Sequence, residues 1–269
     1  MSTLSPLFLS HGAPTLPFED VPARNFLIEL AKSLPRPRAI LMVSAHWETQ
    51  MPRVTAQAHP HTVHDFSGFP ETLYQLRYPA PGDPALAARI IDLLADAGIP
   101  ASADATRGLD HGAWVPLMLM WPKADIPVVQ LSIQSHLGLG HHLQLGQALA
   151  PLTQDGVQII ASGSLTHDLS SWRGQAEMAE PAWVTDFAEW IYSALADQRI
   201  CDLLTYRRQA PFALRNHPSE EHLLPLFVAL GAAGPAARSM RLHQSTTYGV
   251  LRMDAFQFHP SPQQNEGNL

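Results

Sequence analysis

Cysteine, charged residues and long hydrophobic runs are all scarce in this chain of 269 residues. The single cysteine, Cys201, excludes an internal disulfide framework, a thiolate zinc cluster and an iron–sulfur centre. Only 15% of the residues are charged, and a net charge of −7 provides no basic surface for nucleic acid or an anionic membrane. No run approaches the roughly 20 apolar residues of a membrane-spanning helix. We therefore expect a soluble cytoplasmic protein that binds neither nucleic acid nor membrane.

Histidine and proline, in contrast, are abundant, with 14 and 24 copies. Because the chain has a single thiol, a metal ion would be held by imidazole and carboxylate groups rather than by sulfur. Apolar residues make up 46% of the chain, which is usual for a folded protein and excludes general disorder. We expect one catalytic domain over residues 1–258, followed by a flexible tail over 259–269, where the sequence becomes polar.

Short apolar runs alternate with helical patterns, which is typical of βαβ units. Runs without polar alternation predict strands buried on both faces, at Pro6–Ser10, Ala39–Ser44, Pro127–Ile133 and Val157–Ala161. Helical spacing predicts helices between Asp83 and Gly98, after Pro181, and more weakly at 21–34, 113–120 and 141–149. Near the C-terminus, an antiparallel strand pair is predicted at Met240–Gln244 and Val250–Phe258. The predicted fold is α/β, a mostly parallel central sheet with helices on both faces and a small antiparallel edge near the C-terminus.

Three histidines are expected at the carboxyl ends of predicted strands, where ligands bind in open α/β sheets. His11 follows the first strand, His46 the second and His167 the fourth. A single histidine at a strand end is most often a hydrogen-bonded structural residue. Three at one edge of a sheet instead indicate a site for Zn²⁺ or Fe²⁺, which bind the lone pair of a neutral imidazole.

Two further histidines stand near predicted helix starts. His111 directly precedes a helix, a position equally consistent with a pocket residue and with simple helix capping. Glu221 and His222 lie in an acidic helix start, and both are candidate metal ligands. The residues alone do not choose between these two, and they are equally compatible with an exposed helix tip. Pro225 is expected to kink the helix that follows.

The other histidines are not assigned to metal. His59, His61 and His64 lie in a segment that predicts a flexible lid, from which His64 could reach the site. His141 and His142 are adjacent, so they do not share a helix face. The consensus sequences of dinucleotide-binding folds, P-loops, zinc metalloproteases and α/β-hydrolases are absent, which disfavours those chemistries.

Several segments together carry a resemblance to a known family. The segments are FLSHGAP (8–14), PRAILMVSAHWE (37–48), HDFSGFPETLYQLRYPAPGDPALA (64–87), LDHGAWVPL (109–117), IPVVQLSI (126–133), IIASGSLTHDL (159–169) and EEHLLPLFVALGA (220–232). The chain resembles the LigB-like class III extradiol ring-cleavage dioxygenases, and among them the 4,5-DOPA dioxygenase-type proteins of bacteria and plants. The resemblance covers residues 6–258.

The resemblance implies a metal ion held by His11, His46 and His222, with His167 as a catalytic histidine. It also implies that His111 contributes to the pocket for substrate or O2. Side chains expected around the aromatic ring of the substrate are Trp47, His64, Phe69 and Trp114, although each aromatic one could equally belong to the core.

The substrates that the resemblance implies are O2 and a small aromatic ortho-diol, a catechol such as DOPA. Fe(II) is the metal expected for activity. Many ferrous oxygenases use two histidines and a carboxylate, whereas three histidines with water also form a catalytic zinc shell. Because Zn²⁺ binds such sites more tightly than Fe²⁺, we expect zinc in the same site of purified protein. A monomer or a small homo-oligomer is expected.

Two other interpretations remain open at this point. The first is a zinc-dependent hydrolase of a small ester or amide, with His167 as the base toward zinc-bound water. The second is a metal that only stabilises the fold. Ligands as far apart in sequence as 11 and 222 do not resemble a compact structural zinc site, so the second is disfavoured.

Overall fold

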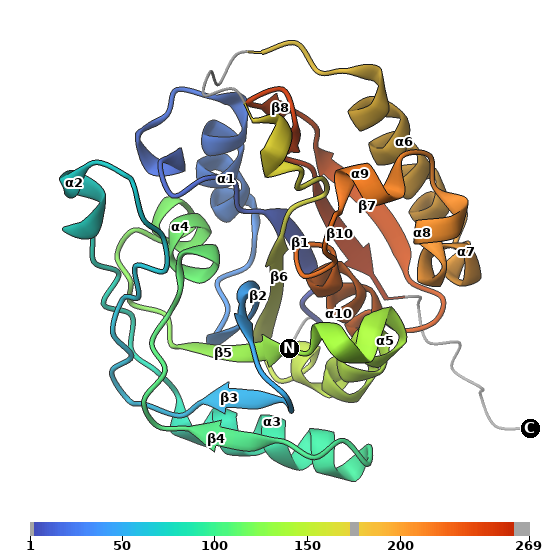
Figure 1. Ribbon diagram of the computed structural model, residues 1–269. Helices are drawn as coiled ribbons and strands as arrows, with labels where there is room; N and C mark the ends of the chain where they lie inside the picture. The colour runs from blue at the N-terminus through green and yellow to red at the C-terminus, as the bar shows by residue number, and fades with distance from the viewer. Residues whose placement is uncertain (1–2, 173–177, 261–269) are drawn as a thin grey trace, which may run out of the picture.

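The computed structural model describes residues 3–172 and 178–260, and within them the chain forms an α/β fold around one large sheet (Figure 1). The strands of this sheet follow the order β4-β3-β5-β2-β6-β1-β10-β7. Their bounds are β1 Leu7–Ser10, β2 Ala39–Glu48, β3 Arg53–Thr55, β4 Ser102–Asp104, β5 Val128–Ile133, β6 Val157–Gly163, β7 Arg238–His243 and β10 Ala255–His259. A separate two-stranded sheet pairs β8, Thr246–Thr247, with β9, Leu251–Arg252.

The centre of the sheet is parallel and its edges are mixed. Strands β5, β2, β6 and β1 run in the same direction. On one side, β10 pairs antiparallel with β1 and with β7. On the other side, β3 is antiparallel to β5 and parallel to β4. The mostly parallel sheet with an antiparallel edge near the C-terminus confirms the predicted fold class.

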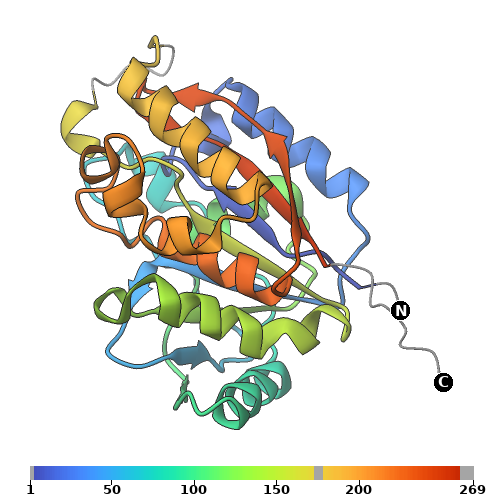
Figure 2. The same cartoon turned by 90° about the vertical axis from the view of Figure 1, so that its right-hand side faces the viewer.

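Helices cover both faces of the sheet because the central strands are apolar on both sides. Along β2, Ile40 and Met42 face a core shared with α1 (Pro22–Ser33) and α4 (His111–Met120). Leu41 and Val43 face the opposite core. That core contains α3 (Pro84–Asp96), α5 (Gly138–Leu149), α6 (Ala182–Ala196) and α10 (Leu224–Ala232). Figure 2 shows α1 behind the sheet and α5, α6 and α10 in front of it.

Shorter helices complete the described part of the chain: α2 Glu71–Tyr74, α7 Ile200–Leu204, α8 Tyr206–Gln209, α9 Ala213–Asn216, and the 3₁₀ segments η1 Leu16–Phe18, η2 Ser135–Leu137, η3 Ala150–Thr153 and η4 Leu169–Ser171. Among the helices described, none is both long and apolar enough to cross a lipid bilayer.

The four predicted central strands and the five predicted helices are present, with different bounds. Strand β2 continues to Glu48, so His46 lies inside the strand rather than after it. The expected strand at Val250–Phe258 is divided into β9 and β10. Pro225 occupies the first turn of α10, where its missing N–H has no intrahelical partner, so it starts this helix rather than kinking it. His259 is still part of β10, and residues 261–269 of the predicted tail lie outside the described residues.

Two glycines allow α5 and α10 to cross in direct backbone contact. A Cβ atom at Gly146 would lie 2.1 Å from the carbonyl oxygen of Val228, and one at Gly231 would lie 2.1 Å from that of Leu143. Neither separation is sterically allowed, so both positions require glycine. Helix α10 begins two residues after His222. This close crossing therefore fixes the place of a candidate metal ligand.

We predict that Gly146→Ala lowers the free energy of unfolding by about 2 kcal/mol, because the methyl group would force α5 and α10 apart. Gly140→Ala in the same helix is the matched control, since a Cβ there would meet no atom within 4 Å. We expect this control to be neutral or to stabilise by up to about 1 kcal/mol. Urea unfolding measures both, and equal effects of the two substitutions would contradict the close crossing.

Candidate metal centre and cavity

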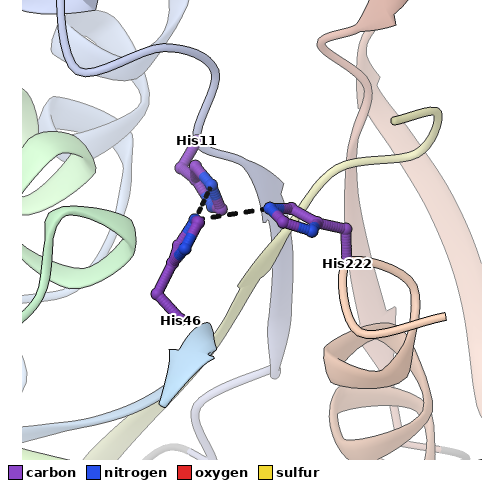
Figure 3. A group of neighbouring side chains, drawn as sticks. All are labelled: His11, His46 and His222. Atoms are coloured by element: carbon purple, nitrogen blue, oxygen red, sulfur yellow. Dashed lines mark hydrogen bonds between the residues drawn. The ribbon is translucent and has the colours of Figure 1, made fainter. Parts of the chain in front are cut away.

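Three imidazole rings from distant parts of the chain meet at the carboxyl edge of the parallel strands. His11 directly follows β1, His46 lies near the end of β2, and His222 precedes α10. The Nε2 atoms of His11 and His46 are 3.0 Å apart, and those of His46 and His222 are 3.3 Å apart (Figure 3). The strand-end position that the sequence predicts for His11 and His46 is where parallel α/β sheets bind ligands.

The N–H group of His11 points away from this meeting point. The hydroxyl of Ser162 donates its only hydrogen to the carbonyl oxygen of Gly112. The same hydroxyl oxygen lies 3.0 Å from Nδ1 of His11, so it must accept a hydrogen bond from Nδ1–H. A neutral imidazole carries one N–H, and therefore Nε2 of His11 presents a lone pair to the other two rings.

Carboxylates orient the other two rings in the same way. Nδ1–H of His222 donates to Oε1 of Glu221 over 3.0 Å. Nδ1 of His46 faces Oδ2 of Asp65 at 3.6 Å. Because an ionised carboxylate only accepts hydrogen bonds, it favours the N–H on the Nδ1 side of each ring. The lone pairs of all three Nε2 atoms therefore converge. Carboxylates and hydroxyls that accept the other N–H of each ring typically orient metal-binding histidines in this way.

Burial keeps these imidazoles uncharged. It lowers the pKa of His11 and of His222 well below the usual histidine range, and the neighbouring histidines lower both further. Burial, followed by the charge of His111, lowers the pKa of His46 to about 3. Two nitrogens bound about 2.1 Å from one ion are separated by about 3.0–3.4 Å, which agrees with the observed Nε2 separations. The donor set therefore fits a divalent ion such as Zn²⁺ or Fe²⁺.

A close backbone approach holds His222 in place. Ser164 donates its backbone N–H to the carbonyl oxygen of His222 over 2.9 Å. A Cβ atom at Gly163, the last residue of β6, would lie 2.1 Å from that same oxygen. Only glycine at the end of β6 therefore lets the segment before α10 reach the edge of the sheet.

His111 is the first residue of α4 and is anchored by Asp65. Its Nδ1 and its backbone N–H both contact Oδ1 of Asp65, at 3.0 and 2.9 Å. Its ring centroid lies 3.9 Å from that of His46. Burial alone would raise the pKa of Asp65, but the hydrogen bonds from His111 outweigh burial and lower it to about 2. This carboxylate therefore stays ionised between His46 and His111.

His167 stacks directly on His222. The two ring centroids are 3.4 Å apart and the planes are tilted by 13°. Nδ1 of His167 lies 4.0 Å from Oε1 of Glu221, and its backbone N–H donates to the carbonyl oxygen of Asn216 over 2.8 Å. Burial lowers the pKa of His167 to about 4, despite the opposing effect of Glu221. The ring is therefore neutral and fixed beside the candidate ligands.

A cavity of about 590 Å³ opens onto the histidines, a size usual for small-molecule sites. Its wall contains five histidines together with aromatic, aliphatic and hydroxyl side chains. The lining residues are His11, Gly12, Ala13, Pro14, Thr15, His46, Phe66, Ser67, Gly68, Phe69, His111, Ser164, His167, Leu169, Trp172, His222, Tyr248 and Leu251. Phe69, expected near the substrate, is among them.

Trp47, His64 and Trp114, which are expected around the substrate from the sequence, are not among the residues that line this cavity. Trp47 follows His46 in β2, so it projects to the opposite side of the strand, where it is buried beneath Arg107. Trp114 is fully buried, with Nε1–H donating to the carbonyl oxygen of Val63. Nε2 of His64 is 3.0 Å from the carbonyl oxygen of Leu76, and its ring lies behind the wall residue Phe66, with centroids 5.8 Å apart.

Sequence reasoning missed Asp65 and did not settle the role of Glu221. Asp65 lies beside His64 in the segment HDFSGFP, and Glu221 precedes His222. A carboxylate next to a candidate histidine is the only sequence signal for such an orienting role. In the structure, Glu221 contacts Nδ1 of His222 rather than the three converging Nε2 atoms.

Among the residues that the structure describes, potential ligand atoms form three overlapping groups, each within 4.8 Å: His11, His46 and His222; His46, Asp65 and His111; and His167, Glu221 and His222. His46 belongs to the first and second groups and His222 to the first and third, and each group also contains one histidine of its own. His11 belongs only to the first group, His111 only to the second and His167 only to the third. Single substitutions at these three positions therefore identify the group that binds an ion.

We predict that His11→Ala weakens Co²⁺ binding by more than about 100-fold, because it removes one of three converging ligands. His111→Ala and His167→Ala should change binding by less than about tenfold, because neither ring joins that group. Anaerobic titration followed by the visible absorption of Co²⁺ measures all three variants. Exposed His136→Ala serves as the control for loss of an unrelated histidine. Stronger loss of Co²⁺ in either of the other variants would assign the ion to a different group.

Comparison with known proteins places this geometry in a family context. Residues 7–256 match the family model described as the catalytic LigB subunit of aromatic ring-opening dioxygenase. A protein of Beta vulgaris named 4,5-DOPA dioxygenase extradiol is 46% identical over 93% of this chain and 95% of its own length. A protein of the same name from Escherichia coli K12 is 43% identical over 84% of each chain.

A solved structure supports the same assignment. The crystal structure of an uncharacterized protein from Escherichia coli K12 shares the fold, with a TM-score of 0.78 and 35% sequence identity. The similarity covers 94% of this chain and 99% of that protein. Sequence motifs, fold and relatives therefore agree, and the chain belongs to the LigB family of aromatic ring-opening dioxygenases.

Proposed function

We propose that this protein is an extradiol dioxygenase that uses O2 to open the ring of a catechol, DOPA or a related ortho-diol. The active ion that we propose is Fe(II), held by His11, His46 and His222. The observation that carries the proposal is the convergence of three neutral Nε2 lone pairs at the wall of a cavity in a LigB chain. Relatives that are named 4,5-DOPA dioxygenase extradiol support the reaction and the substrate class.

A ferrous ion at this site would bind both catechol oxygens and O2 and allow electron density to pass between them. The three imidazoles that hold the ion are neutral, so they leave its full double charge to attract a catecholate. They also come from three separate segments that are each fixed by hydrogen bonds. The site therefore needs little rearrangement to receive its substrate.

His167 is the proposed acid–base residue. Its Nδ1 faces Glu221, so Nε2 is the atom that would take a proton from a catechol hydroxyl. The pKa of about 4 leaves this nitrogen unprotonated at neutral pH, as a proton acceptor must be. Stacking on His222 fixes the ring plane, so the proton moves at a defined position beside the bound diol.

His111 and the phenylalanines of the cavity wall are proposed to position the substrate. Asp65 holds Nδ1–H of His111, so its Nε2 can accept a hydrogen bond from a substrate hydroxyl. Phe66 and Phe69 lie with their ring centroids 5.3 Å apart and provide an apolar surface for an aromatic ring. Packing of the ring against them would also exclude water from the reacting face.

The remaining features of the proposal concern the protein as a whole. We propose a single catalytic domain over residues 1–258 that acts in the cytoplasm as a monomer or small homo-oligomer. The single cysteine and the net charge of −7 support this location and argue against nucleic-acid and membrane partners. The zinc hydrolase alternative has no support among the relatives, which are named as dioxygenases.

The direct test is anaerobic reconstitution with Fe(II), followed by addition of a panel of catechols and then of O2. We expect stoichiometric O2 uptake and a coloured ring-opened product with at least one catechol. Protein loaded with Zn²⁺ should bind the same catechol without O2 uptake. Absence of uptake across the panel, together with ester hydrolysis by the zinc form, would contradict the proposal.

We predict that His167→Ala lowers the turnover number by about 10²–10⁴-fold, because the proton acceptor is lost. Iron content should remain close to one ion per chain, measured on the same samples. His136→Ala, an exposed histidine outside the cavity lining, is the control and should keep full turnover. A parallel loss of iron and turnover in His167→Ala would show that this residue is a ligand instead.

A further inference from the structure

Two hydroxyl groups in the cavity wall are bound to the same carboxylate. Thr15 and Tyr248 both line the cavity, and both hydroxyls donate to Oε1 of Glu19. Thr15 and Glu19 flank the short helix η1, which begins five residues after His11. Tyr248 comes from the turn between β8 and β9, more than two hundred residues later in the chain. The long-range contact therefore closes one side of the cavity.

The hydrogen-bond direction determines what this wall offers to a ligand. A hydroxyl has one hydrogen, and in both residues Glu19 receives it. The oxygen atoms of Thr15 and Tyr248 are left with lone pairs only, so they can accept hydrogen bonds but not donate them. Burial and the bond to Glu19 raise the pKa of Tyr248 to about 12, so the phenol keeps the proton that it donates.

The backbone of Tyr248 adopts a strained conformation, which indicates that the position of its side chain is important for function. Tyr248 has a φ of +57° and the following Gly249 a φ of +71°. Glycine adopts this left-handed region freely, whereas for a bulky residue it is a strained conformation. Strain of this kind persists where surrounding contacts hold it, and it is concentrated at functional sites. The contacts of Tyr248 include those of its hydroxyl with Glu19 and Thr15 and of its ring with Trp172.

Two aromatic rings in the cavity wall also favour a positively charged ligand. The rings of Trp172 and Tyr248 both line the cavity, with centroids 5.4 Å apart in an edge-to-face arrangement. The face of an indole or phenol ring attracts a cation. A negative carboxylate, two acceptor-only oxygens and two aromatic rings together favour a positively charged hydrogen-bond donor over a carboxylate.

We propose that Glu19, Thr15 and Tyr248 form a subsite for an ammonium group on the side chain of the catechol substrate. Thr15 and Tyr248 accept its hydrogen bonds, and Glu19 is a positioning residue that orients both hydroxyls and supplies the negative charge. The enzyme therefore selects catechols with an aminoalkyl arm over those of equal length that end in a carboxylate. This inference rests on the proposed function, because the catechol end of the ligand defines the other half of the cavity.

The test measures dissociation constants of dopamine, dihydroxyphenylpropionate and ethylcatechol by calorimetry on Zn²⁺-loaded protein under nitrogen. These compounds carry an ammonium, a carboxylate and no charge on similar arms. We expect the wild-type protein to bind dopamine at least about tenfold more tightly than the propionate, as for one charge-assisted hydrogen bond. In Glu19→Gln this ratio should fall at least about tenfold, because the negative charge is lost.

Two further variants separate selectivity from general damage. Asp20→Asn removes the same charge from the next, exposed position, so it should leave the ratio within about twofold. Tyr248→Phe removes only the phenolic oxygen and should lower the ratio at least about threefold. It keeps the inference testable if Glu19→Gln does not fold. The ratio between two ligands of one protein does not respond to a uniform loss of active protein.

Two outcomes would overturn the inference: equal binding of dopamine and the propionate by the wild-type protein, or equal ratios in Glu19→Gln and Asp20→Asn. O2 uptake by the Fe(II) form, measured on the same compounds, reports separately on the proposed function. Binding selectivity without any O2 uptake would support the ammonium subsite and contradict the dioxygenase. O2 uptake without charge selectivity would support the dioxygenase and contradict the ammonium subsite.

Discussion

Three imidazole nitrogens with inward-facing lone pairs lie within 3.0–3.3 Å of their neighbours, and this arrangement governs the rest of the site. Ser162 and Glu221 accept the Nδ1–H groups of His11 and His222, and Asp65 faces Nδ1 of His46, so each Nε2 atom presents a lone pair to the others. Lone pairs at such distances repel unless a cation lies between them. Burial also disfavours protonation of the rings, so a bound metal ion would relieve this repulsion.

The fold maintains this unfavourable convergence by fixing each ring independently. Parallel strands β1 and β2 deliver His11 and His46 to one edge of the sheet. The close crossing of α5 and α10, together with the glycine at the end of β6, brings His222 to the same edge from the far side. The carboxylates of Asp65 and Glu221 face the Nδ1 atoms of His46 and His222, outside the three converging Nε2 atoms. The cavity extends from the histidines to the hydroxyls of Thr15 and Tyr248, and we propose that this one pocket holds both the diol and the charged arm of the substrate.

Much of this architecture could be predicted from the sequence, for identifiable reasons. The apolar runs of the central strands are long enough to be distinctive, whereas β3 and β4 have three residues each and carry no pattern. Strand-end histidines follow from the strand predictions, but the choice between Glu221 and His222 depends on ring orientation. The place of Trp47 could not be predicted either. The strand predicted from the sequence ends at Ser44, and only the continuation of β2 to Glu48 places Trp47 on the side of the strand opposite His46. The contact of Glu19 with Tyr248 joins segments whose proximity no local pattern indicates.

The most direct test of the central claim is X-ray absorption at the metal edge of protein loaded with one Fe(II) or Zn²⁺ per chain. The account predicts three imidazole nitrogens at about 2.0–2.1 Å, with the remaining positions taken by water oxygen. Imidazole scattering should fall from three rings to two in His11→Ala. A first shell with one or two imidazoles and carboxylate oxygen from Asp65 or Glu221 would contradict it.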